Sequence, residues 1–164
     1  MDRVQIKLVR HIFIICFLTL LFVFTMINFK DVVIKRESMI AMGELGKFIL
    51  DYRSKVGSLP SQYTVENVIP TLRPNARLGQ IQYRAPWIGY DAGPDTILVY
   101  SSRDFNSFLL KDGAVVLTLD GKVHFWDEQK FREILSHQQS QAEINERSEA
   151  FSRSYSVPNK PVMP

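Results

Sequence analysis

Hydrophobic and polar positions follow two different patterns along the first third of the chain. From Ile12 to Phe29 no residue is charged, and apolar side chains occupy every side of a helix drawn over this range. Such a helix would span about 27 Å, close to the thickness of the hydrocarbon core of a bilayer. A domain of this size could hardly surround a helix that is apolar on every side. We therefore predict one transmembrane helix over 12–29, preceded by a short tail over 1–11.

The next residues, 30–56, are expected to continue the same helix with a different surface. Apolar residues recur three and four positions apart, as in Leu45, Phe48 and Ile49, and charged residues fill much of the opposite face. This spacing is typical of an amphipathic helix with one buried face. Gly57 provides a stop signal directly after this range. One helix is therefore expected to leave the membrane and to become amphipathic as far as residue 56.

Glycine and proline punctuate this helix and the segment that follows it. Gly43 and Gly46 lie inside the predicted helix and mark either a kink or a close packing contact. The stretch 58–86 is rich in proline and is predicted to be a loop. It is expected to hold one short helix, Thr64–Leu72, capped by Thr64.

A β pattern begins near residue 81 and continues to residue 126. Two Asp-Gly pairs, Asp112-Gly113 and Asp120-Gly121, separate the last three runs, and such pairs favour tight hairpins. Asp127 is expected to cap a final helix that lies on the sheet. The predicted strands are Ile81–Tyr83, Thr96–Ser101, Ser107–Leu110, Ala114–Leu119 and Lys122–Trp126.

These elements predict an α+β fold. An N-terminal transmembrane helix continues into a long amphipathic helix, which packs on a small antiparallel β-sheet. The head domain is expected over 57–135. Residues 136–164 carry few apolar anchors, so we predict a frayed polar helix followed by a disordered tail.

Charge and cysteine content narrow the possible functions. The net charge of +3 comes from basic residues scattered among acidic ones, without a continuous basic stripe. Nucleic acid is therefore not an expected partner. The single cysteine, Cys16, cannot form an intramolecular disulfide and is expected to face lipid as a small apolar residue.

No familiar catalytic motif occurs in the sequence. It has no phosphate-binding glycine loop, no HExxH motif and no G-x-S-x-G motif. His124 alternates with Val123 and Phe125 along a predicted strand, so it is expected to face solvent rather than to act as a base. We expect no enzymatic activity and no cofactor. Aromatic side chains are expected to fill the core, although they could instead line a shallow ligand groove: Tyr83, Trp87, Tyr90, Tyr100 and Trp126.

The apolar segment is expected to be an uncleaved anchor rather than a signal peptide. It is longer than a usual signal-peptide core, and no pair of small residues follows it for a signal peptidase. Three basic residues flank each end of the segment, so the charge difference does not set its orientation. Because the N-terminal tail is short, it is expected to stay in the cytoplasm, with the head outside. The lipid bilayer is the first expected partner.

YRSKVGSLP at Tyr52–Pro60 lies where the long helix is expected to meet the head, and APWIGYDAGPDTILVYSS at Ala85–Ser102 holds a turn that precedes the strands. These segments, together with the order of elements, resemble the type IV pilins and, more closely, the pseudopilins of type II secretion systems. The strand start at Asp120–Val123 is similar to a DG-V motif of prepilin-like proteins. The chain departs from the family pattern around Arg10–Phe22, where the glycine and the glutamate of the prepilin peptidase motif are missing.

The resemblance implies a structural or assembly subunit in a bacterial inner membrane, which binds other pilin-like subunits through its long helix. It also implies a calcium site, because some pseudopilins bind this ion through acidic loop residues. Asp91, Asp95 and Asp104 lie in the comparable region, and oxygen ligands suit calcium. Aspartates are equally common in plain turns. The alternative function is a membrane-tethered ligand-binding or sensing module.

Overall fold

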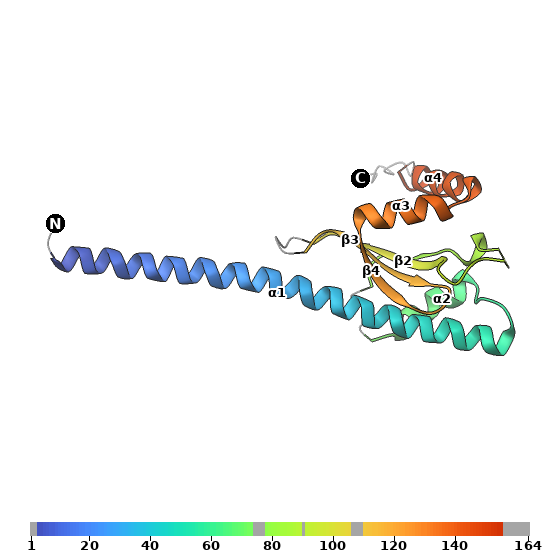
Figure 1. Cartoon of the computed structure of the whole chain (residues 1–164), viewed down its shortest axis with the longest axis horizontal. Coiled ribbons are helices and arrows are strands. Elements are labelled where there is room, and N and C mark those ends of the chain that lie inside the picture. The colour runs from blue at the N-terminus through green and yellow to red at the C-terminus, as the bar shows by residue number, and fades with distance from the viewer. Residues whose placement is uncertain (1–2, 74–77, 90, 106–109, 156–164) are drawn as a thin grey trace, which may run out of the picture.

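The computed structural model describes residues 3–73, 78–89, 91–105 and 110–155, and it shows one long helix joined to a head built around a sheet (Figure 1). The long helix runs along one face of the sheet, and the two C-terminal helices lie on its other side (Figure 1). In chain order the elements are α1 (Arg3–Val56), α2 (Gln62–Val68), η1 (Ile69–Thr71), β1 (Gln82–Tyr83), η3 (Ala85–Trp87), β2 (Ile97–Arg103), β3 (Gly113–Thr118), β4 (Val123–Asp127), α3 (Glu128–Gln138) and α4 (Gln141–Tyr155).

Helix α1 is unbroken over 54 residues, which confirms that the apolar segment continues into the amphipathic one. At 1.5 Å per residue it is about 80 Å long. It ends where the sequence predicts, because Gly57 adopts a φ of 81° and donates its N–H to the carbonyl of Arg53 at 2.8 Å. This left-handed conformation is cheap only for glycine and stops the helix.

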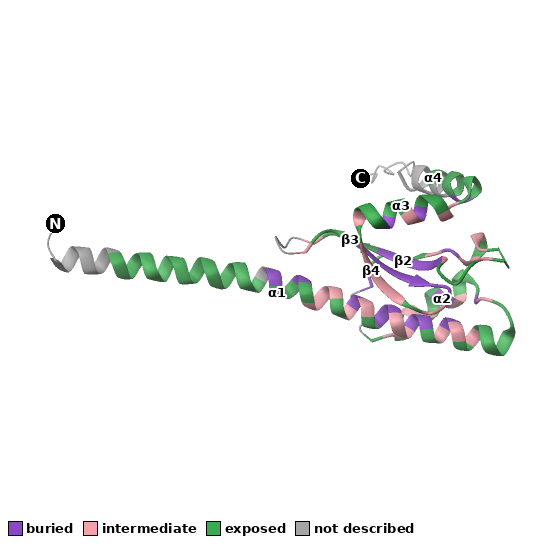
Figure 2. Ribbon diagram, in the orientation of Figure 1, coloured by how far each residue is buried: buried purple, intermediate pink, exposed green. Residues whose placement is uncertain are grey.

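The exposure of α1 changes sharply along its length (Figure 2). Side chains over 12–26 are exposed on all sides. Helix α1 is long and apolar enough, from Arg10 onward, to cross a membrane. From Asn28 and Asp31 onward one side of the helix is buried. The head therefore begins to cover α1 just before residue 30, the boundary that the sequence suggests.

The sheet has four antiparallel strands in the order β1-β2-β3-β4, as the alternating pattern predicts. The predicted hairpin at Asp120-Gly121 is confirmed, since Gly121 has a φ of 84° between β3 and β4. One face of the sheet packs against α1 through Met42, Leu45 and Ile49. The other face packs against α3, where the rings of Tyr100 and Phe131 lie 4.9 Å apart.

The other Asp-Gly pair, Asp112-Gly113, does not form the predicted turn. Gly113 is the first residue of β3, pairs with both Arg103 and Asp127, and lacks the positive φ of a tight hairpin. Glycine is needed there for a different reason: a Cβ atom at this position would collide with the carbonyl oxygen of Trp126. The strand predicted at 107–110 falls largely outside the described residues.

The short helix after the prolines also differs from its prediction. It begins earlier, at Gln62, because Ser61 rather than Thr64 provides the cap. The Ser61 hydroxyl accepts a hydrogen bond from the backbone N–H of Thr64 at 3.2 Å. After Val68 the helix tightens into a 3-10 turn that contains Pro70.

The C-terminal region begins as predicted. The Asp127 carboxylate caps α3 by accepting the N–H of Lys130 at 2.9 Å. Helix α4 follows, and it is attached to the head through Glu143, whose side chain is fully buried. A polar helix is predicted in this region and α4 is one, but its attachment through a buried charged side chain was not predicted. The predicted tail over 156–164 lies outside the described residues.

Candidate functional site

One continuous line of exposed residues runs along α1 on the side opposite the sheet. We call it the outer stripe and define it as Phe29, Val32, Arg36, Ile40, Lys47 and Asp51. The spacing of three, four and seven positions places these residues on one side of the helix. Val32 and Ile40 remain 50% and 49% exposed although they are apolar. The outer stripe therefore offers both apolar and charged groups to a partner.

A shallow apolar groove adjoins the outer stripe near the point where α1 leaves its apolar segment. Its volume is about 490 Å³, and Val32, Met39 and Ile40 form its helical wall. Leu110 and Val123 close it on the side of the head. Lys35, which also lines the groove, places its ammonium 3.8 Å from the centre of the Phe125 ring. This cation–π contact ties α1 to β4 at the edge of the sheet.

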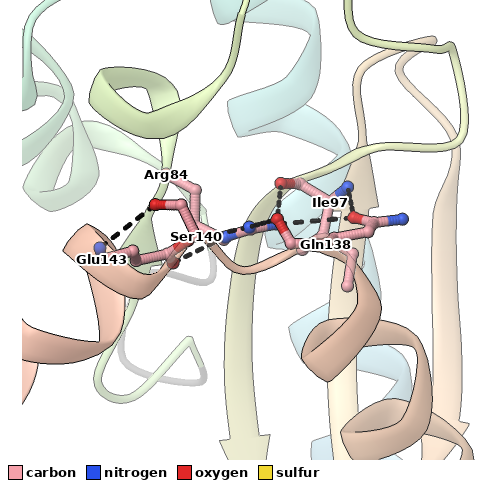
Figure 3. A network of polar contacts seen from close by, with 5 residues as sticks. All are labelled: Arg84, Ile97, Gln138, Ser140 and Glu143. Carbon is pink, nitrogen blue, oxygen red and sulfur yellow. Dashed lines mark hydrogen bonds and ion pairs between the residues drawn. The ribbon is translucent and has the colours of Figure 1, made fainter.

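Arg84 forms the most deeply buried polar network of the described residues (Figure 3). It follows β1, and its backbone N–H extends the sheet by donating to the carbonyl of Leu98 at 2.8 Å. Its guanidinium forms two parallel bonds to the Glu143 carboxylate, Nε to Oε1 at 2.8 Å and Nη2 to Oε2 at 2.9 Å. Such a bidentate pair fixes direction as well as distance, so it sets how α4 approaches the sheet.

The same guanidinium also holds the link between α3 and α4. Nη2 donates to the carbonyl of Gln138 at 2.8 Å, and Nη1 donates to the carbonyl of Ile97 at 2.9 Å. The Gln138 side chain returns to the sheet by accepting the N–H of Ile97 at 2.8 Å (Figure 3). The Ser140 hydroxyl accepts the N–H of Glu143 at the start of α4. Each buried polar group of the link therefore has a partner.

A second groove lies where α2, β1, η3 and α4 meet, and we call it the aromatic groove. Its volume is about 260 Å³. Tyr83 and Trp87 supply its aromatic wall, while Glu66 and Glu146 supply two carboxylates. Burial, followed by repulsion from Tyr52, raises the pKa of Tyr83 well above its usual value. The phenol is therefore neutral, and it donates its proton to the carbonyl of Pro60 at 2.7 Å.

A third hollow, of about 370 Å³, lies at the C-terminal end of α1. Arg53 and Ser58 line it from the helix end, and Leu59, Ile88 and Leu119 form apolar walls. Because α1 runs away from its apolar segment toward this end, the hollow lies on the part of the head that is far from the candidate membrane span (Figure 1).

The structure does not bring the predicted calcium ligands together. Asp95 precedes the seven-residue strand β2 and Asp104 follows it, so roughly 20 Å of extended chain separates them. Asp91 is an exposed turn residue near the Asp95 end. Among the described residues, no group of three acidic, histidine or cysteine side chains could hold a metal ion. Calcium binding therefore remains a prediction that this geometry does not support.

The aromatic residues of the sequence prediction divide between core and groove. Tyr100 is buried in the core, and Trp126 packs beside the same cluster, whereas Trp87 and Tyr83 line the aromatic groove. Tyr90 lies outside the described residues. His124 is half-buried rather than fully solvent-facing, because its ring stacks on Trp126 with centroids 5.7 Å apart.

Sequence reasoning missed Arg84 and Glu143 altogether. Neither residue belongs to a motif, and 59 positions separate them. One signal was present: Glu143 is spaced three residues after Ser140, which is the pattern of a capping box at a helix start. That pattern indicates a helix but cannot name a partner on the sheet.

The fold and its surfaces define an α+β protein with a candidate membrane-spanning helix. Protein-family models, curated proteins and solved structures all gave no match to this chain. The functional proposal therefore rests on the geometry of α1 and of the head.

Proposed function

We propose that the protein is a membrane-anchored structural or assembly subunit that resembles a pseudopilin of a type II secretion or type IV pilus-like system. One observation carries this proposal. Helix α1 is a single unbroken rod whose apolar residues over 12–26 are exposed on all sides and whose second part is buried on one side only. A rod of this kind suits a subunit that packs side by side with copies or relatives.

The outer stripe supports the proposal because, from Val32 onward, it is a helix face that the head leaves exposed. Lys47 and Asp51 carry opposite charges one helical turn apart on this face, and Asp51 forms an exposed ion pair with Lys55. Ile40 supplies an apolar centre. A neighbouring helix could match both features. The apolar groove beside Ile40 would accept side chains of that neighbour without further rearrangement.

We further propose a single-pass location in a bacterial inner membrane, with the head on the extracytoplasmic side. The chain lacks the glycine and glutamate of the prepilin peptidase motif around Arg10–Phe22, so the anchor would remain uncleaved. The proposed role is structural rather than enzymatic. The long helix would hold subunits together, and the sheet would face outward.

Cross-linking of intact membranes with an amine-reactive reagent at native expression tests this proposal. A regular ladder of multimers is expected for the wild type. Ile40→Asp places a charge in the centre of the outer stripe and should abolish the ladder, whereas Glu133→Gln on exposed α3 should leave it intact. A wild-type protein that stays strictly monomeric would rule the proposal out.

A membrane-tethered ligand-binding module is the second candidate, and one observation favours it. The head contains two hollows apart from the groove at the membrane end, the aromatic groove and the hollow at the end of α1. Binding of a soluble ligand to full-length protein in nanodiscs, together with a monomeric state in native membranes, would favour this candidate over assembly.

A further inference from the structure

We propose that the aromatic groove binds an organic cation, in the form of an alkylammonium or guanidinium group. This inference does not depend on assembly through α1, and it gives the second candidate function a ligand class. It is carried by the side chains that three distant parts of the chain bring to one place.

The groove is assembled from segments that lie far apart in the sequence. Helix α2 supplies Glu66, the segment from β1 to η3 supplies Tyr83 and Trp87, and α4 supplies Glu146. Val65 beside Glu66 is buried in the core, so α2 is firmly held. The groove therefore gains its second carboxylate, that of Glu146, only when the C-terminal helix is docked on the sheet.

The buried ion pair explains how Glu146 reaches this place. Glu143 lies one helical turn before Glu146 on α4, and its bidentate bond to Arg84 fixes both the position and the rotation of that turn. Arg84 itself directly follows Tyr83 in the chain. The same short segment thus supplies an aromatic wall of the groove and the anchor that brings the second carboxylate to it.

The groove carries a negative charge. No described residue of the chain supplies a counter-ion to it. Glu66 accepts a hydrogen bond from Gln62 at 2.9 Å, but neither Glu66 nor Glu146 forms an ion pair with a described residue. The described residues that line the groove include no lysine and no arginine. A cation in the groove would pair with both of these exposed carboxylates.

The aromatic wall narrows the class of cation. Ring faces attract a cation whose charge lies within about 6 Å of the ring centre, and they also favour contact with an apolar stem. Tyr83 and Trp87 are both only half exposed, and Ile69 and Ile81 add apolar surface beside them. A small metal ion would use the carboxylates alone, whereas an alkylammonium or guanidinium group uses both kinds of wall.

The volume of about 260 Å³ is sufficient for one such group with its stem. The cation could come from a free polyamine or from a lysine or arginine side chain of a polypeptide. The chemistry of recognition is the same for both sources, so the probes of the experiment must separate them.

Fluorescence titration of Trp87 tests the inference directly. The chain contains two tryptophans, so Trp126→Phe leaves Trp87 as the only reporter. Full-length protein in zwitterionic phosphatidylcholine nanodiscs is titrated with spermidine and with N-acetyl-arginine amide. N-acetyl-citrulline amide, which has nearly the shape of the arginine probe without its charge, is the matched control ligand.

A saturable change with either cation, and none with the citrulline probe, is the expected result. A response to spermidine alone identifies a free polyamine as the source, and a response to the arginine probe identifies a side chain. Removing both charges with Glu66→Gln and Glu146→Gln should weaken binding roughly tenfold, as expected for two exposed charge contacts. Glu133→Gln, which removes one carboxylate charge on α3 outside the groove, should leave affinity unchanged.

Three results would overturn the inference: no saturable response to either cation, an equal response to the citrulline probe, or an unchanged affinity in the double variant. None of these results bears on the proposal that subunits assemble through α1, which is tested by cross-linking in native membranes. Conversely, a monomeric protein that binds the cation would refute assembly and leave this inference in place.

Discussion

Arg84 and Glu143 are 59 positions apart in the chain, yet they form a bidentate ion pair whose side chains are 1% and 0% exposed. Removing one partner leaves the other charge buried without compensation. Glu143→Ala is therefore expected to lower the free energy of unfolding by about 3–5 kcal/mol. Urea denaturation followed by tryptophan fluorescence measures this loss, and proteolysis of α4 should become faster at the same time.

Two variants separate the ion pair from other effects. Arg84→Met with Glu143→Leu removes both charges and should recover most of the lost stability, because apolar residues of similar size can replace a buried pair. Glu128→Gln breaks the exposed pair with Arg132 and should cost less than about 1 kcal/mol. Equal losses in Glu143→Ala and Glu128→Gln would show that the buried pair does not anchor α4.

Gly43 and Gly46 allow a matched test of how closely α1 packs on the sheet. A Cβ atom at Gly43 would lie 3.9 Å from Val123, an ordinary contact, whereas one at Gly46 would lie 2.7 Å from Leu117. Both substitutions to alanine gain helix propensity. Gly43→Ala should therefore stabilise the protein by about 0.5–1 kcal/mol, and Gly46→Ala should be about 1–3 kcal/mol less stable than Gly43→Ala.

Thermal and urea denaturation of the two variants under identical conditions measure this difference. If Gly46→Ala raised the free energy of unfolding as much as Gly43→Ala, this result would contradict the close approach of α1 to β3. The further variant Leu117→Val shortens the opposing side chain, so it should reduce the penalty of Gly46→Ala in the double variant.

The hairpin between β3 and β4 predicts a dependence of stability on pH. A hydrogen bond from the Lys122 ammonium, followed by those from the Thr118 hydroxyl and the Lys122 backbone N–H, holds the pKa of Asp120 well below its usual range. A depressed pKa stabilises the folded state above the unfolded pKa of about 3.9, and this contribution is lost as the pH falls through the folded value.

Asp120→Asn should therefore differ most from the wild type near neutral pH and approach it in acid. Urea denaturation at several pH values between about 2 and 7 measures the difference in the free energy of unfolding. Glu133→Gln removes an exposed carboxyl group elsewhere and serves as the control. The same pH dependence in both variants would show that the hairpin contacts do not lower the pKa of Asp120.

The sequence was sufficient for the elements that depend on local pattern. The continuous helix, its stop at Gly57, the hairpin at Gly121 and the cap at Asp127 all follow from residue spacing and from backbone preferences. Such features need no knowledge of distant contacts. The same local reasoning placed the cap of α2 at Thr64, although Ser61, a residue type that caps helices more often than threonine, lies three positions earlier and provides the cap.

Features that depend on distant contacts could not be predicted. Gly113 looked like a turn residue, but its role is to let β4 approach closely, which becomes visible only with strand register. The pairing of Arg84 with Glu143 and the joint approach of Glu66 and Glu146 to one groove depend on how α4 docks. Neither can be read from a single sequence, because tertiary partners leave no periodic signal.

Assembly through the outer stripe of α1 is tested most directly by a cysteine scan. In a Cys16→Ala background, single cysteines are placed at Ile40, Lys47 and Asp51 on the outer stripe. Met42, Leu45 and Ile49, which face the sheet, provide the buried comparison. Glu133→Cys on α3 is exposed but remote from α1, so it controls for accessibility alone. Disulfide dimers are formed by mild oxidation of intact membranes at native expression.

The proposal predicts that dimer yield rises and falls with the period of the helix. Yield should be high at the three positions of the outer stripe and low at the three buried positions and at residue 133. A flat profile, or a yield at residue 133 equal to that at residue 40, would contradict the central claim that α1 packs on neighbouring subunits.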